Sequence, residues 1–266
     1  GIVAFVGSWL FVEETERDRD RKLDWLGFIA LVVAVLAIQL GLSRGERLDW
    51  WSSTEVVTEL GIGSLALLLF FVRNYTTSNP FVPGELLTDR NFVIGAVLFL
   101  IFGAVLILPI VMLPLLLQQL GGYPVFTAGA LLFPRGLGTI SALLLSGTLA
   151  ANTDPRRLLV FGLLLIVFAN WRMSAWTPDV SSWEISWTTA IQGFGSGITF
   201  VPNIAIAFWS VSDRYRTEGL SFLYLLFYFG SAVGVACIFA LQAKLAQVNR
   251  AQLVENVTHH NERFGL

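Results

Sequence analysis

Long apolar stretches, separated by short polar segments, constrain this chain more than any other feature. About 20 apolar residues suffice to cross a bilayer as a helix. Seven such runs are predicted, at 25–43, 56–73, 91–118, 126–149, 157–175, 185–210 and 217–242. None alternates with period two, which argues against barrel strands, and only 14% of the residues are charged. The sequence therefore predicts an all-α, polytopic membrane bundle.

A shorter apolar segment, residues 1–12, precedes these runs. It has no basic n-region and no small-residue cleavage site, so it does not resemble a signal peptide. We expect it to be the end of a truncated span, which makes the chain a fragment: a stub plus seven spans. Residues 13–24 mix both charge signs with an excess of acids, and we expect a solvated cytoplasmic connector there.

Lysine and arginine in the short loops predict the orientation. If the stub ends in the cytoplasm, ten of these residues fall inside and six outside, and the tail 243–266 starts an external loop. The nine tryptophans lie near predicted span ends, where aromatic rings favour the headgroup region. We expect an integral membrane protein.

Enzymatic chemistry is not indicated by the residues. Both histidines, His259 and His260, fall in the polar tail, and the spans carry no carboxylate pair, metal-ligand spacing or nucleotide-binding loop. The sequence predicts no enzyme, no metal and no cofactor. A net charge of −2 gives no sign of a nucleic-acid partner. The single cysteine, Cys237, is expected to be a small core residue.

Arg135 lies in the middle of an apolar run. A charge at the bilayer centre costs several kcal/mol, so it should face the bundle interior or water. It would then line a translocation path, binding an anionic group or pairing with an acid on another helix. Two alternatives remain: Arg135 lies near a span end and snorkels, or it contacts backbone carbonyls.

Prolines and polar residues occur together in two of the spans. Pro134 directly precedes Arg135, and Pro202 directly precedes Asn203. Prolines free backbone carbonyls, which find partners along cavities. Gln192 shares a span with Asn203 and lies on the same face about three turns away. We expect Arg135, Pro134, Asn203 and Gln192 along the translocation path, although interhelical hydrogen bonding would also explain the amides.

Small residues four positions apart let helix backbones approach closely in lipid. Gly193 and Gly197 form one such pair, and Gly230 and Gly234 form another. We expect both pairs to be helix-packing faces. The alternative is that they are surfaces that slide in a conformational change.

Several stretches carry a resemblance to a known family. They are DRDRKLDWLGF (18–28), LSRGERLDWWSS (42–53), NPFVPGELLTDRNFVIG (79–95), LPLLLQQLGGYPVFTAGALLFPRGLGT (113–139) and IQGFGSGITFVPN (191–203). The chain resembles the fourteen-span drug:proton antiporters of the major facilitator superfamily, the EmrB/QacA type. The resemblance implies two linker spans within 25–73 and, within 91–242, five helices of a six-helix C-terminal transporter bundle. The N-terminal bundle, with the proton-coupling acid, would lie outside this chain.

The resemblance also assigns a gate-loop motif. The stretch GTLAANTDPRR (147–157) is similar to the family's cytoplasmic loop. The resemblance assigns the motif positions of that loop to Gly147, Leu149 and Arg157. The family's acid position is Ala151 here, and Asp154 comes three residues later. Leu225 and Phe227 stand where relatives often have Asn and Arg.

These features favour part of a proton-coupled multidrug efflux transporter that works by alternating access on small amphipathic substrates. Resemblance to the EmrB branch implies an integral protein of a bacterial inner membrane and a membrane-fusion adaptor as a partner. One alternative is a same-fold transporter of a specific metabolite, such as an anion held by Arg135. Another is a non-transporting remnant or scaffold membrane protein, because the departures remove polar groups.

Overall fold

Helices make up all the regular structure in the described part of the chain. The computed structural model describes residues 2–11, 24–77, 80–119, 121–177 and 179–256. Its elements are α1 (Ile2–Phe11), α2 (Trp25–Gly45), η1 (Trp50–Ser52), α3 (Thr54–Thr76), α4 (Gly84–Thr88), α5 (Arg90–Gln119), α6 (Val125–Asn152), α7 (Pro155–Ser174), α8 (Ser182–Ala207), η2 (Asp213–Tyr215) and α9 (Arg216–Asn256). Seven of the described helices are long and apolar enough to cross a membrane. The predicted all-α membrane fold is confirmed.

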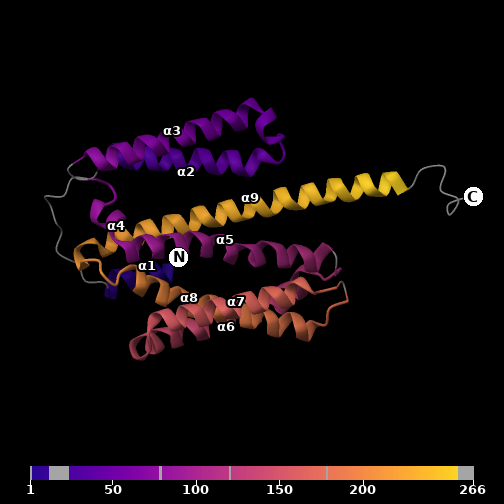
Figure 1. Ribbon diagram of the computed structural model, residues 1–266. Helices are drawn as coiled ribbons and strands as arrows, with labels where there is room; N and C mark the ends of the chain where they lie inside the picture. The colour runs from indigo at the N-terminus through magenta and orange to yellow at the C-terminus, as the bar shows by residue number, and fades with distance from the viewer. Residues whose placement is uncertain (1, 12–23, 78–79, 120, 178, 257–266) are drawn as a thin grey trace, which may run out of the picture.

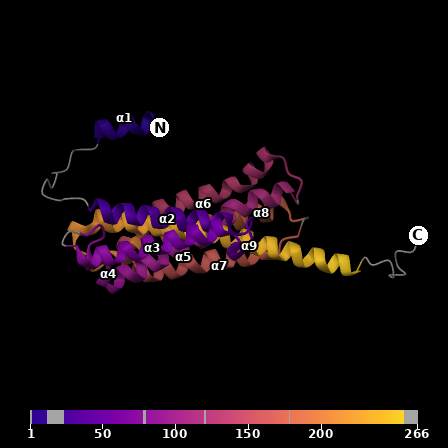
Figure 2. The same ribbon diagram turned by 90° about the horizontal axis from the view of Figure 1, so that it is seen from above.

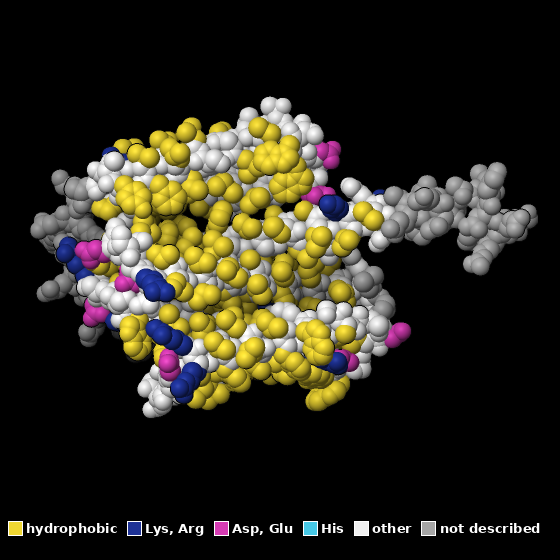
Figure 3. Space-filling view, in the orientation of Figure 1, with side chains coloured by type: hydrophobic (Ala, Val, Ile, Leu, Met, Phe, Trp, Pro, Cys, Tyr) yellow, Lys and Arg dark blue, Asp and Glu magenta, His cyan; other side chains and the backbone are white. Residues whose placement is uncertain are grey.

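The outer surface matches a bilayer environment. Figure 3 shows hydrophobic side chains across the middle of the bundle, with acidic and basic side chains gathered toward its two ends. Many large apolar residues face outward, among them Leu144 at 74% exposure and Val167 at 63%. Trp25 and Trp183, each at the beginning of a spanning helix, are also exposed. Such a surface is stable in lipid, whereas in water it would aggregate.

The spanning helices form a hairpin and a larger group. Helices α2 and α3 run side by side as a pair, and Figures 1 and 2 show this pair lying along α5 and α9. Within the larger group, α8 packs against α6 and α7, while α5 packs mainly against α9 and also contacts α8. The division into two linker spans and a transporter bundle stays a prediction.

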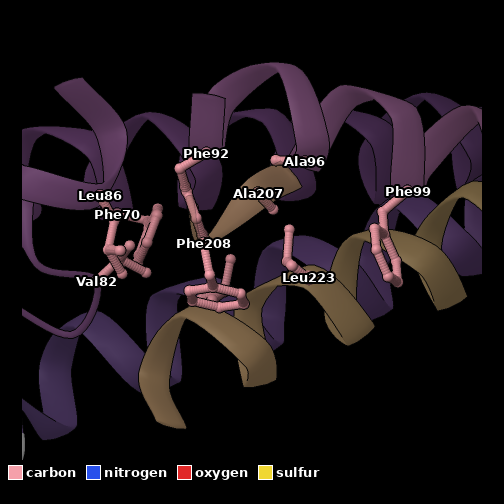
Figure 4. Packing of buried hydrophobic residues seen from close by; sticks show 10 residues of the cluster. Phe70, Val82, Leu86, Phe92, Ala96, Phe99, Ala207, Phe208 and Leu223 are labelled. Atoms are coloured by element: carbon pink, nitrogen blue, oxygen red, sulfur yellow. The ribbon is translucent and has the colours of Figure 1, made fainter. Parts of the chain in front are cut away.

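A continuous apolar core joins the hairpin to the larger group. Leu31 and Phe70 come from the hairpin, and they share one buried cluster with Leu86, Phe92 and other residues of the larger group. Figure 4 shows Phe70 beside Val82 and Leu86, with Phe92 pointing toward Phe208 farther along the same cluster. The chain segment between α3 and α5 therefore contributes to packing and is more than a connector.

Polar contacts reinforce this junction. Asp24 is the N-cap of α2 and accepts a hydrogen bond from the Gly27 amide, and its buried carboxylate also pairs with Arg73 of α3 at 3.2 Å. Asn74, which is buried, accepts a hydrogen bond from the Val82 amide at 3.1 Å. These bonds connect the beginning of α2, the end of α3 and the segment that leads to α4.

Replacing Asn74 with alanine should loosen the junction. The buried Val82 amide would lose its acceptor, and an unsatisfied buried donor costs about 1–3 kcal/mol. We expect a lower unfolding temperature in detergent, measured by fluorescence-detected size exclusion after heating. Thr76→Ala, on an exposed position two residues away, is the matched control and should leave this temperature unchanged. Equal effects of the two substitutions would show that the Asn74 bond does not stabilise the junction.

Helix α9 differs from the expected boundary at its C-terminal end. The sequence interpretation ended this span at 242 and began an external loop at 243, whereas the helix continues to Asn256. The added segment is rich in Ala, Leu and Gln and contains no Gly or Pro, so no residue in it stops the helix. Figure 1 shows α9 projecting past the ends of its neighbours. Cys237, expected in the core, is exposed on this helix, so that prediction was wrong.

Candidate functional site

Helices α6 and α8 cross with their backbones in contact. A Cβ added to Gly193 would lie 2.0 Å from the Arg135 carbonyl oxygen, and one added to Gly197 would lie 2.6 Å from that of Thr139. The Thr139 hydroxyl donates a hydrogen bond to the Gly193 carbonyl oxygen at 3.1 Å. Only glycine permits this approach, because any side chain would push the two helices apart.

The crossing of α5 and α9 repeats this arrangement. A Cβ on Gly230 would lie 2.0 Å from the Leu100 carbonyl oxygen, and one on Gly234 would lie 2.6 Å from that of Ala104. The Ser231 hydroxyl of α9 donates a hydrogen bond to the Gly103 carbonyl oxygen of α5 at 3.1 Å. This bond corresponds to the one from Thr139 to Gly193 at the first crossing. The structure thus places all four predicted packing glycines at helix–helix contacts. Whether these contacts also slide stays a prediction.

The α6–α8 crossing also carries Arg135. Its Nε donates to Oε1 of Gln192 at 2.6 Å, and its Nη2 lies 3.5 Å from the Leu106 carbonyl oxygen on α5. Arg135 lies about 15 Å from the beginning of α6, and from there its side chain reaches both α8 and α5. It is directed at a buried amide and does not extend to a helix end, which disfavours snorkelling. Within the described ranges, the ion pairs of the structure do not include Arg135.

Gln192 and Asn203 are both buried inside α8. Gln192 is 0% exposed and Asn203 is 1% exposed. Gln192 Nε2 and Asn203 Oδ1 have no hydrogen-bond partner in the described part of the chain. Buried polar atoms are usually paired, so these two are unusual. The structure brings Gln192 to Arg135, whereas it shows no bond between Asn203 and either residue. Pro134 is half-buried within α6.

The gate-loop residues lie where α6 ends and α7 begins. Gly147, Leu149 and Arg157 are all exposed. Asp154, which the sequence left without a role, is the N-cap of α7: its carboxylate accepts from the Arg156 amide at 2.9 Å. An Asp followed by Pro at the first helical position is a recognisable capping signal. Asp154 therefore has a local structural role as the cap of α7.

A cavity of about 550 Å³ opens beside this turn, lined by residues 150–156 together with Asn91, Ile206 and Trp209. Asn91, which lines this cavity, donates a hydrogen bond to the Ser210 hydroxyl at 2.9 Å. At the nearby beginning of α5, slight burial raises the pKa of Asp89, but hydrogen bonds from the Ser210 hydroxyl and from the Phe92 and Asn91 amides lower it overall. Asp89 is therefore an ionised group at this end of the bundle at neutral pH.

Sequence reasoning missed an aromatic cluster between α5, α8 and α9. The Phe200 ring centroid lies 5.5 Å from that of Phe99 and 6.0 Å from that of Tyr224. Phe227, noted only as a departure from the family pattern, lies 6.1 Å from Phe102 and 6.2 Å from Phe200. Rings at these distances pack favourably. The signal was available as aromatic residues spaced three apart on each of two helices, α5 and α9, but their partners are far away in sequence.

Comparison with known proteins agrees with this architecture. A family profile described as Major Facilitator Superfamily matches residues 1–235. The chain is 29% identical over 254 residues to Multidrug export protein EmrB of Escherichia coli K12, covering 93% of this chain and 48% of the relative. It is 27% identical over 263 residues to Fatty acid resistance protein FarB of Neisseria gonorrhoeae, covering 98% and 52%. It is 23% identical over 235 residues to Multidrug resistance protein 3 of Bacillus subtilis, covering 88% and 46%.

The chain spans about half the length of the curated relatives it matches. The profile nevertheless covers most of the chain, and seven of the described helices are long and apolar enough to cross a membrane. The protein is thus an integral protein of a bacterial inner membrane, and it is a member of a family of transporters and not of enzymes. The chain belongs to the Major Facilitator Superfamily.

Proposed function

We propose that this chain supplies the linker spans and most of the C-terminal bundle of a proton-coupled multidrug antiporter that works by alternating access. The observation that carries the proposal is the position of Arg135, a charge held deep among spanning helices by a buried amide. Such a charge is costly in lipid and is normally retained for function. An export role is supported by the similarity to proteins named for multidrug export.

Alternating access requires a second bundle for this one to move against. We propose that it lies in the part of the transporter outside this chain, together with the proton-coupling acid. A membrane-fusion adaptor as a further partner rests on the EmrB likeness alone. The relatives' names cover both multidrug export and fatty acid resistance, so family membership leaves the substrate class open.

Arg135→Ala, made in the full-length transporter, tests the proposal. We expect ethidium export to fall at least tenfold, because the substitution removes the buried hydrogen bond that joins α6 to α8 along the path, while the amount of protein in the membrane stays the same. Export is measured as ethidium efflux from energised cells, and coupling as proton release on adding substrate to inside-out vesicles. Arg47→Ala, in the loop after α2, is a matched control and should export normally. Export by Arg135→Ala at the wild-type rate would exclude Arg135 from the path.

A further inference from the structure

A cavity of about 540 Å³ lies between α2 of the hairpin and α9, with part of α5 also lining it. Figures 1 and 2 show the hairpin lying along α9. Helix α9 packs closely on α5 and only lightly on α2, which leaves this space between them. Three polar residues of the α2 wall, Gln39, Ser43 and Glu46, follow one another at helical spacing on one face. The α9 wall, from Tyr228 to Phe239, is mainly apolar.

The cavity is open to the surface that faces lipid. Tyr228 is 68% exposed, and Gln39 is exposed on the opposite wall although it lies within a spanning helix. Gln39 is six residues from the end of α2, about 9 Å along the helix. Its amide makes no hydrogen bond within the described residues. A polar group at this depth is costly unless it is paired, so Gln39 calls for a hydrogen-bonding partner supplied by the membrane.

Glu46 places a negative charge at the end of this cavity. It is the C-cap of α2, where the helix dipole disfavours an anion. Among the described residues it takes part in no ion pair. Arg44 is engaged by two other carboxylates, and Arg47 does not line the cavity. A cationic group therefore complements the charge of Glu46.

The loop after α2 holds the Glu46 carboxylate on one side only. Asp49 and Trp50 have φ angles of 56° and 47°, which are uncommon for residues other than glycine. A Cβ on Gly45 would lie 2.6 Å from the Trp50 ring, so glycine lets the indole pack on the end of α2. Trp50 Nε1 then donates to Glu46 Oε2 at 3.2 Å. Glu46 Oε1 has no hydrogen bond in the described part of the chain and is left for a ligand.

We propose that this cavity binds a membrane phospholipid with an ethanolamine head group. The lipid ammonium donates to Glu46, and Gln39 Nε2 donates to an ester carbonyl oxygen of the same lipid. The two side chains are seven residues apart, about 10.5 Å along α2, which is comparable to the separation of those groups in one lipid molecule. The acyl chains lie against the apolar wall of α9. The site takes a component of the bilayer and does not depend on the export function.

Ethanolamine suits this site better than the other common head groups. Its ammonium carries N–H donors, which form charge-assisted hydrogen bonds with a carboxylate. The trimethylammonium of choline has no N–H group, and its methyl groups keep the charge farther from the carboxylate. A glycerol head group has no positive charge, so the lipid phosphate would be repelled by Glu46.

Native mass spectrometry of the purified full-length transporter tests the assignment. Phosphatidylethanolamine, phosphatidylcholine and phosphatidylglycerol with identical acyl chains are titrated in turn, and the dissociation constants of the first bound lipid are compared. We expect phosphatidylethanolamine to bind about fivefold more tightly than the other two, the order expected of one partly exposed ion pair. Glu46→Gln keeps the shape and removes the charge, so it should abolish this preference. Gln39→Leu removes the donor to the ester region, which all three lipids share, so it should weaken all three alike.

Asp49→Asn is the matched control. Asp49 is exposed in the same loop and does not line the cavity, so its neutralisation should leave the lipid preference unchanged. Size exclusion and unfolding temperature establish that each variant is folded, and Gln39→Leu tests the site independently if Glu46→Gln does not fold. Equal binding of the three lipids to the wild type, or a preference that survives Glu46→Gln, would overturn the assignment. Binding of tetraphenylphosphonium that depends on Glu46, with no lipid binding that does, would instead make the cavity a site for cationic substrates.

Discussion

Replacing Gly193 with leucine is expected to prevent α6 and α8 from crossing. The first side-chain atom alone would lie 2.0 Å from the Arg135 carbonyl oxygen, and that oxygen belongs to backbone that cannot rotate away. Overpacking usually costs about 1–3 kcal/mol and sometimes more. Because the clash is with a helix backbone, we expect about 3 kcal/mol or more here. Most of the protein should aggregate during extraction, as seen by fluorescence-detected size exclusion.

Gly129→Leu is the control for this prediction. Gly129 lies on α6, and a Cβ there would meet nothing within 4 Å. It makes the same change of residue type without a clash, so the extracted protein should remain monodisperse. We expect Gly230→Leu at the α5–α9 crossing to behave like Gly193→Leu, because its clash with the Leu100 carbonyl oxygen is equally close. A monodisperse Gly193→Leu protein would show that this crossing is not tightly packed.

Phe92→Ala is expected to have the second large effect. Phe92 is 0% exposed, and its ring centroid lies 5.7 Å from that of Phe208 and 6.4 Å from that of Phe222. It therefore joins the beginning of α5 to the end of α8 and to α9. Truncating such a side chain leaves a cavity and costs about 3–5 kcal/mol. We expect a lower unfolding free energy in detergent–denaturant titration and earlier loss of the monodisperse peak on heating.

The neighbouring residue Ile94 provides the matched control. Its side chain is 44% exposed on the outer surface of α5, so Ile94→Ala removes apolar contacts without opening a cavity in the core. We expect its unfolding free energy to stay within about 0.5 kcal/mol of wild type, as for surface substitutions in general. Equal losses for Phe92→Ala and Ile94→Ala would mean that the buried cluster does not stabilise the junction.

Much of the candidate site could be predicted because its parts break the local pattern. Arg135 and Gln192 are polar residues in apolar runs, and the sequence alone shows that contrast. The contact between them could not be predicted, because they lie 57 positions apart on helices whose rotation about their axes is set by packing. The glycine pairs were predicted for a similar reason, since spacing indicates a packing face. The aromatic cluster was missed because apolar residues are uniformly common in spans, so no single phenylalanine there is conspicuous.

The sequence by itself determined which segments cross the membrane. A span is specified locally: about 20 apolar residues must form a helix in lipid, since each backbone polar group has to be satisfied within its own segment. The end of α9 differs from the expected boundary because hydropathy marked the end of the apolar run, whereas the polar residues after it still favour a helix. Only the tertiary structure decided that Gly193 contacts the Arg135 backbone, that Gln192 holds the guanidinium and that Phe70 of the hairpin packs against Leu86. In lipid, helices associate through close packing of small and polar residues, and such complementarity exists only between two surfaces once they are brought together.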